Sequence, residues 1–203
     1  VPLFATTEPI ERALDVFRKT LAHEEPAMIA AKLGLVALDS DPASGDLELV
    51  EELFALLRVT ETDMTIAFRR LADVPTAGAS TAGDATLCAP LADAYYAPSE
   101  VDDALRTRTA RWLRSYAARV TRDGTPDEVR RARMNAVNPK YVLRNYLAQL
   151  AIDGAEKGDP SELHALLEVL RRPYDEQPGR ERYAEKRPEW ARHRVGCSML
   201  SCS

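Results

Sequence analysis

Apolar residues recur at intervals of three and four along almost the whole of this sequence, and this periodicity constrains the fold more than any other feature. Such spacing places apolar side chains on one face of an α-helix. The sequence has no alternating β-branched run and no Asn-Gly hairpin signal, so it indicates no strand. The clearest amphipathic stretches are 10–21, 47–57, 101–120, 142–151 and 163–170. We therefore predict an all-α fold.

Proline, glycine and capping residues divide the helical pattern into elements. Pro9 suits the first turn of one helix, and we expect a second, short helix to begin at Pro26 and to end at Gly34. Proline is favoured in a first helical turn, and glycine readily adopts the left-handed conformation that ends a helix. Residues 125–128 pair a Thr with a Glu three positions later, which is a capping-box pattern. Another helix is therefore predicted to start there, and Asp63 is expected to cap the helix that follows it.

The chain length of 203 residues suits one domain with a substantial core. Residues 76–86 are rich in Ala, Gly, Ser and Thr and are typical of a surface loop. After Pro173 the pattern becomes charged and irregular. The predicted organisation is a first helical segment, a surface loop, a second helical segment that packs on the first as one domain, and an irregular tail, at 1–75, 76–98, 99–172 and 173–203.

Composition and charge exclude several classes of protein. Apolar residues make up 45% of the chain and only three cysteines are present, which argues against a disordered chain and against a disulfide scaffold. Residues 1–100 carry seven Lys and Arg against 17 Asp and Glu, whereas residues 101–203 carry 20 against 15. The basic residues are interleaved with acids and form no cationic stripe with aromatic steps, so we expect no nucleic-acid partner. No apolar run is long enough to span a membrane.

The sequence lacks the common catalytic and binding motifs. It has no Gly-rich phosphate loop, no kinase-type catalytic loop and no Asp-Phe-Gly metal motif. His23, His164 and His193 lie far apart among charged residues, so we expect surface histidines and no metal site. Arg171 and Arg172 could bind a phosphate, but cations in a last helical turn also offset the helix dipole, and we favour that explanation.

The three cysteines differ in their setting. Cys88 falls in the predicted loop and suggests no special role. Cys197 and Cys202 lie among small residues close to the end of the chain. Thiols on such a tail are expected to be accessible, as disulfide exchange requires, although two idle tail cysteines would have the same pattern.

A polar block at 138–149, NPKYVLRNYLAQ, resembles a signature of the selenoprotein O family, whose members are pseudokinase-like protein adenylyltransferases. Further blocks follow the order found in that family, and only residues 76–97 diverge. These blocks are 1–3 (VPL), 32–35 (KLGL), 63–65 (DMT) with 68–69 (FR), 156–159 (EKGD), 170–174 (LRRPY), 187–190 (RPEW) and 200–203 (LSCS).

The resemblance implies a larger enzyme with a protein-kinase-like fold, of which this chain would be the C-terminal portion, containing helices of the large lobe. Such an enzyme binds ATP with Mg²⁺ or Mn²⁺ and transfers AMP to Ser, Thr or Tyr of protein substrates. No nucleotide- or metal-binding motif of the family matches a position in this chain. We therefore assign no catalytic, cofactor-binding or metal residue here, and expect the chain to bind no cofactor and to be inactive alone.

The resemblance also implies a redox role for the tail. Cys202 occupies the position of a family cysteine that can form a disulfide with a cysteine near the activation loop. Its partner would lie upstream of residue 1, and Cys197 is a possible substitute for Cys202. Reversible thiol chemistry of this kind fits a reducing bacterial cytoplasm.

The block at 138–149 has two interpretations. Asn138 and Asn145 could satisfy helix ends while Arg144 joins a carboxylate in a satisfied network, or the block could support a nucleotide pocket. We favour the structural interpretation, because Leu143, Leu147 and Leu150 are expected to pack.

Another hypothesis is open for the whole chain, namely a freestanding helical module whose acidic and basic halves bind a partner protein. The absence of an initiator Met at Val1 favours a piece of a longer protein. If the missing part leaves an apolar face exposed, the piece is expected to self-associate.

Overall fold

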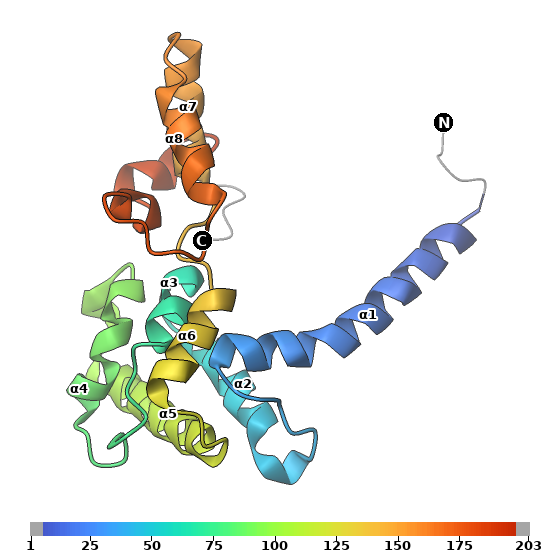
Figure 1. The fold of residues 1–203 in the computed structure, drawn as a ribbon, viewed down its shortest axis with the longest axis vertical. Helices are drawn as coiled ribbons and strands as arrows, with labels where there is room; N and C mark the ends of the chain where they lie inside the picture. Colours follow the sequence, from blue (N-terminus) through green and yellow to red (C-terminus); the bar gives the residue numbers. More distant parts are fainter. Residues whose placement is uncertain (1–5, 198–203) are drawn as a thin grey trace.

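A computed structural model describes residues 6–197 and is all-α over them, as predicted (Figure 1). The β pairing recorded between these residues is an isolated bridge from Thr62 to Tyr95. The α-helices are α1 (Glu8–Leu33), α2 (Asp46–Leu56), α3 (Met64–Leu71), α4 (Asp84–Cys88), α5 (Asp103–Arg122), α6 (Asp127–Val137), α7 (Asn145–Glu156) and α8 (Ser161–Leu170). Short 3₁₀ helices are η1 (Pro42–Ser44), η2 (Ala89–Ala94), η3 (Pro98–Glu100), η4 (Glu181–Ala184) and η5 (Glu189–His193).

One continuous helix, α1, replaces the two helices expected before Gly34, so that expectation was wrong. Pro26 lies inside α1, where it costs a backbone hydrogen bond. The turns that follow it are fixed by packing, because Ile29 and Leu33 are buried in the core. Gly34 ends the helix as predicted, with φ 71° and its N–H donating to the Ala31 carbonyl oxygen at 3.1 Å.

The first hydrophobic core lies where α2, α3, α5 and α6 meet the C-terminal end of α1. Buried polar groups of this core find acceptors on the backbone. Trp112 Nε1 donates to the Leu49 carbonyl oxygen at 2.8 Å, and the Tyr116 hydroxyl donates to the Leu33 carbonyl oxygen at 2.7 Å. The buried Arg130 guanidinium donates to the Val74 carbonyl oxygen at 2.7 Å. The core is therefore held by packing and by satisfied buried donors.

The segment at 76–98 contains α4 and η2. Leu87, Ala79 and Ala94 from this segment are buried, and α4 packs along α5. Small residues give no helical periodicity, which is why the sequence indicated a surface loop there. The division of the chain into domains stays a prediction.

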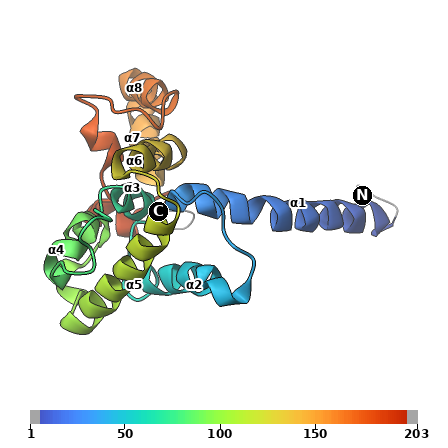
Figure 2. The ribbon, with the colours of Figure 1, turned by 60° about the horizontal axis from the view of Figure 1, so that its bottom comes forward.

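A second hydrophobic cluster joins the α7–α8 hairpin to the residues that follow it. Tyr146 and Leu147 from α7 and Val169 from α8 are buried against Tyr183 of η4. Figure 1 shows this hairpin standing above the helices of the first core, while most of α1 extends away to the right of them. Figure 2 shows the same projection of α1 from a second direction.

Candidate functional site

The site that the sequence singled out is the end of the chain, and the structure shows how the residues before it are held. Glu61, which precedes α3, accepts hydrogen bonds from Arg187 Nη2 at 2.5 Å and from Arg192 Nη2 at 2.6 Å. Burial alone would raise the pKa of Glu61, but the hydrogen bonds from Arg192 and Arg187 outweigh it and hold the pKa below its usual value. We call Glu61, Arg187 and Arg192 the Glu61 clasp.

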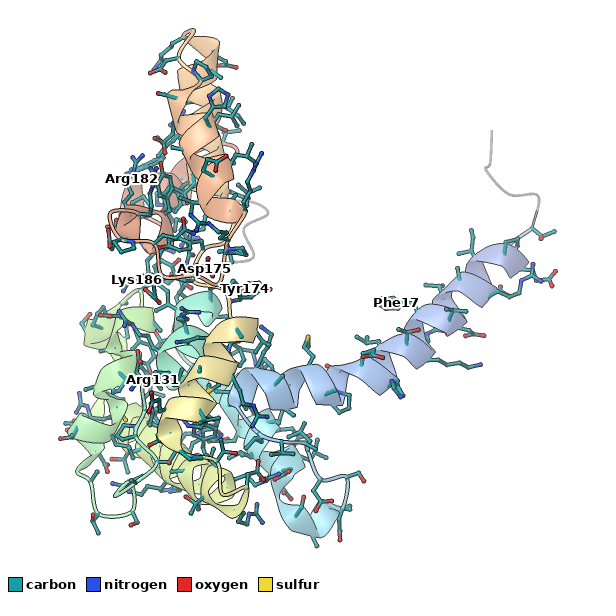
Figure 3. The ribbon with its side chains drawn as sticks, in the orientation of Figure 1. Phe17, Arg131, Tyr174, Asp175, Arg182 and Lys186 are labelled. Carbon is teal, nitrogen blue, oxygen red and sulfur yellow. The ribbon has the colours of Figure 1, made fainter. Side chains whose placement is uncertain are left out.

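A second set of contacts supports the clasp. Lys186 Nζ donates to the Tyr95 carbonyl oxygen at 2.5 Å, and the Arg187 N–H donates to the Tyr96 hydroxyl at 3.2 Å. The Arg187 guanidinium lies 5.1 Å from the centroid of the Tyr96 ring. Figure 3 shows Lys186 where the returning chain meets the helices of the first core. The clasp and these contacts attach residues 186–192 to that core.

Asp63 and Arg144 form a buried ion pair at the centre of this junction. Their side chains are 0% and 1% exposed, and Arg144 Nη1 lies 2.5 Å from Asp63 Oδ2. Asp63 Oδ1 caps α3 by accepting from the Ile66 N–H at 3.0 Å, as its sequence position predicted. The Tyr96 hydroxyl donates to Asp63 Oδ2 at 3.2 Å. One carboxylate therefore serves a helix cap, a guanidinium and a phenol.

The structural interpretation of the block at 138–149 is confirmed in two respects. Asn138 Nδ2 donates to the Lys32 carbonyl oxygen near the end of α1 at 2.8 Å, and Arg144 joins a carboxylate. Two details were wrong. Leu143 is 61% exposed and Leu150 is also exposed, so neither packs as expected. The network is also not fully satisfied, because Nε and Nη2 of Arg144 are buried and have no hydrogen-bond partner among residues 6–197.

Cys197 is fully buried against α7, so the expectation that this thiol is accessible was wrong. Its N–H donates to the Arg194 carbonyl oxygen at 3.0 Å, and Arg194 Nη2 donates to Asp153 Oδ2 of α7 at 2.6 Å. Gly196 has φ 85°, and a Cβ placed on it would lie 2.5 Å from Gln149 Oε1. The chain is therefore fixed on α7 up to residue 197. Cys202 lies outside the described residues.

The other residues considered from the sequence lie apart from this junction. Cys88 is the last residue of α4 and is half-buried, and burial raises the pKa of its thiol to about 11. His23, His164 and His193 are exposed, as predicted. Arg171 and Arg172 are exposed as well, and lie within reach of Glu168 and Asp175, at 3.6 and 4.0 Å.

A cavity of about 780 Å³ lies between α3, η2 and the returning chain. Its size would admit a nucleotide, but its basic side chains already have protein partners. Arg69 Nη2 lies 2.7 Å from Glu176 Oε1, and Arg70 Nη2 lies 2.8 Å from Asp93 Oδ2. Lys140 Nζ also contacts Glu176, while Lys186 and Arg187 are engaged as described.

Within residues 6–197, the side chains around this cavity do not fit a nucleotide and its metal ion. Phosphates need uncommitted cations or a row of free backbone N–H groups, and the basic groups of the cavity are committed to protein acceptors. Within residues 6–197, no group of three or more His, Cys, Asp or Glu side chains is arranged to hold a metal ion. We therefore derive no chemical step from this chain.

Sequence reasoning placed Asp63 as a helix cap and Arg144 as a bridge, but it did not bring them together. It missed Glu61, which carries the clasp. Many helices are preceded by a carboxylate, so only the contacts with Arg187 and Arg192 distinguish Glu61.

Over the described part of the chain, no helix has the length and apolar character that crossing a bilayer would need.

Comparisons with known proteins identify relatives along the chain. The family model described as "Protein adenylyltransferase SelO" matches residues 2–171. Curated relatives named "Protein nucleotidyltransferase YdiU" match all of this chain, with 53% identity for the protein from Rhodopirellula baltica, 48% for that from Aromatoleum aromaticum and 49% for that from Xanthomonas campestris pv. campestris. The chain spans 38%, 36% and 37% of their respective lengths.

Proposed function

The chain belongs to the protein adenylyltransferase SelO family, and we propose that it is the C-terminal helical region of an enzyme that transfers AMP from ATP to Ser, Thr or Tyr of protein substrates. One observation carries this proposal: relatives named as nucleotidyltransferases are about half identical to it over its whole length, yet are far longer. The nucleotide and its Mg²⁺ or Mn²⁺ would be bound by the part of the enzyme that this chain does not include.

The test of this function compares two proteins. The 203-residue chain and the product of the full gene are each incubated with α-labelled ATP, Mg²⁺ or Mn²⁺ and a bacterial protein extract. We expect labelled AMP on protein hydroxyl groups with the full gene product and none with the 203-residue chain. AMP transfer by the 203-residue chain alone would contradict the proposal that another part of the enzyme binds the nucleotide. No transfer by the full gene product would contradict the enzymatic function itself.

The tail would regulate this enzyme through Cys202, in a reducing cytoplasm. Support comes from the firm attachment of the chain on α7 up to Cys197, which leaves five residues to reach Cys202. Five extended residues span at most about 18 Å, and a disulfide adds at most about 7 Å between Cα atoms. The Cα atom of the partner cysteine would therefore lie within about 25 Å of the Cα atom of Cys197. Oxidation by glutathione disulfide would join the two thiols and release two glutathione molecules.

This redox role is tested in the full gene product treated with reduced or oxidised glutathione. We expect a disulfide that contains Cys202 by mass spectrometry, and an activity change that Cys202→Ser abolishes. The matched control is Cys88→Ser, since the raised pKa of Cys88 makes it a poor nucleophile. Equal activity of wild type and Cys202→Ser in both redox states would refute regulation by this thiol.

The alternative function is a freestanding module that binds a partner protein. The observation that favours it is the exposed apolar face of α1. The length of the relatives favours the enzyme, and sequencing upstream of Val1 distinguishes the two. A coding sequence for a kinase-like small lobe supports the enzyme, whereas a nearby start codon supports the module.

A further inference from the structure

The first five turns of α1 carry an apolar face that nothing in the described chain covers. Ile10, Leu14, Phe17 and Leu21, which we call the α1 stripe, are between 45 and 61% exposed. At 100° per residue these four side chains lie within a narrow sector of the helix. Figure 3 shows Phe17 on the projecting part of α1, clear of the other helices. An exposed row of large apolar side chains is typical of an interaction surface.

The opposite side of α1 is suited to water. Arg12 pairs with Glu8 at 3.4 Å and Arg18 with Asp15 at 3.2 Å, and all four side chains are well exposed. These pairs are formed within the helix, so the polar side needs no partner. The helix therefore has one side for solvent and one side for another surface.

The helix also needs that other surface for its own stability. Within α1 only Ile29, Ala30 and Leu33 are buried, so its first five turns have no tertiary packing against the other residues that the structure describes. A solvated helix of this length is marginal in water, because helices in proteins gain most of their stability from packing an apolar face. Pro26 separates these turns from the packed end.

A partly apolar groove on the body of the protein lies on the same side of α1, beyond the end of the α1 stripe. Met28 lies two helical turns beyond Leu21 on the same face of α1. It lines a groove of about 280 Å³ with Phe54, Met64, Phe68 and Pro139. Met28 and Met64 are both largely exposed. The groove thus joins the packed end of α1 to α2 and α3, and Glu24 lies between Met28 and the α1 stripe.

We propose that the α1 stripe and this groove dock against the part of the full-length protein that the 203-residue chain does not include. The relatives are about 2.7 times as long as this chain, so a large partner belongs to the same polypeptide. Covalent linkage gives such a partner a high effective concentration, which favours docking through a small apolar surface. The proposal rests on the length of the relatives and not on adenylyl transfer.

A second copy of this chain fits the stripe less well. Self-association through helices usually needs an apolar repeat over three or four heptads. The stripe ends at Leu21, and Glu24 takes the next position of the repeat. A charged side chain at that position opposes a symmetric helix pair.

The test uses the full gene product and the 203-residue chain, each as wild type, as Leu14→Ser/Phe17→Ser, and as the control Val16→Ser/Ala22→Ser on the polar side of α1. Hydrogen exchange is measured over residues 8–25. We expect exchange at least about tenfold slower in the full product than in the 203-residue chain. In the full product, the stripe variant should lose this protection and the control variant should keep it. In the 203-residue chain both variants should melt at the wild-type temperature, which shows that they fold.

Three results would overturn the proposal. One is equal exchange of residues 8–25 in the two wild-type proteins. Another is slow exchange of residues 8–25 in the 203-residue chain that disappears on dilution, together with a dimer in sedimentation. A second copy of the chain would then cover the α1 stripe. The last is a full gene that encodes nothing beyond this chain.

Discussion

Asp63 and Arg144 are 81 residues apart in the chain, and their buried ion pair connects the two hydrophobic clusters of the protein. Asp63 caps α3 of the first cluster, and Arg144 directly precedes α7 of the second. Both side chains are buried, and Nε and Nη2 of Arg144 have no hydrogen-bond partner in the part of the chain that the structure describes. Neither side chain can be removed without leaving the other as an uncompensated buried charge.

We expect Arg144→Met to lower the free energy of unfolding by about 3–5 kcal/mol, because the variant leaves the Asp63 carboxylate buried and unpaired. Urea denaturation of the 203-residue chain measures this loss. The control is Arg171→Met, which removes an exposed pair with Glu168 and should cost about 0–1 kcal/mol. Equal losses in the two variants would show that the buried pair is not a principal contact of the junction.

Local sequence signals predicted the parts of the fold that local chemistry decides. The helical periodicity predicted the fold class. The carboxylate of Asp63 caps α3, and Gly34 ends α1 in the left-handed conformation, both as expected from the sequence. Each of these depends on residues within one or two turns. The carboxylate partner of Arg144 and the clasp on Glu61 depend on contacts across 81 and more than 120 residues, which one sequence does not reveal.

Tertiary packing decided the points where the sequence misled. A proline normally starts or breaks a helix, but burial of Ile29 and Leu33 keeps α1 continuous through Pro26. Small residues around Cys197 indicated an accessible thiol, but the ion pair between Arg194 and Asp153 draws this segment onto α7 and buries the sulfur.

Gly34 is expected to tolerate no side chain. Any L-residue there would be strained at φ 71°, by about 1–2 kcal/mol, and a Cβ would also lie 2.7 Å from Arg130 Cγ and 2.8 Å from Met134 Cγ. Overpacking adds about 1–3 kcal/mol. Gly158→Ala is the matched control, since its φ is 87° and its Cβ would meet no atom within 4 Å. Thermal unfolding should show a clearly larger loss for Gly34→Ala. Equal losses would mean that α6 moves freely away from α1.

The Cys88 thiol should make stability depend on alkaline pH. Burial raises the pKa of this thiol from 9.0 to about 11 in the folded chain, so the unfolded chain loses its proton first. The contribution of the Cys88 thiol to the free energy of unfolding is therefore complete below pH about 9 and declines as the pH rises toward 11. Urea unfolding from pH 8 to 11 should show a steeper decline for wild type than for Cys88→Ala. Parallel curves would show that the thiol is well solvated.

The Glu61 clasp should control how firmly the end of the chain is held. In Glu61→Gln the guanidinium groups of Arg187 and Arg192 lose their carboxylate. We therefore expect residues 180–194 to open more often and trypsin to cleave at these arginines several-fold faster.

Acid should act in the same direction, because the pKa of Glu61 is lowered in the folded state. Its stabilising contribution is present above its unfolded value of 4.5 and is lost as the pH falls through the folded value. Glu189→Gln is the control, since Glu189 contacts Arg192 from within η5 and its side chain is exposed. Mass spectrometry of the tryptic fragments follows the cleavage, and equal rates for Glu61→Gln and Glu189→Gln would show that the clasp does not hold this segment.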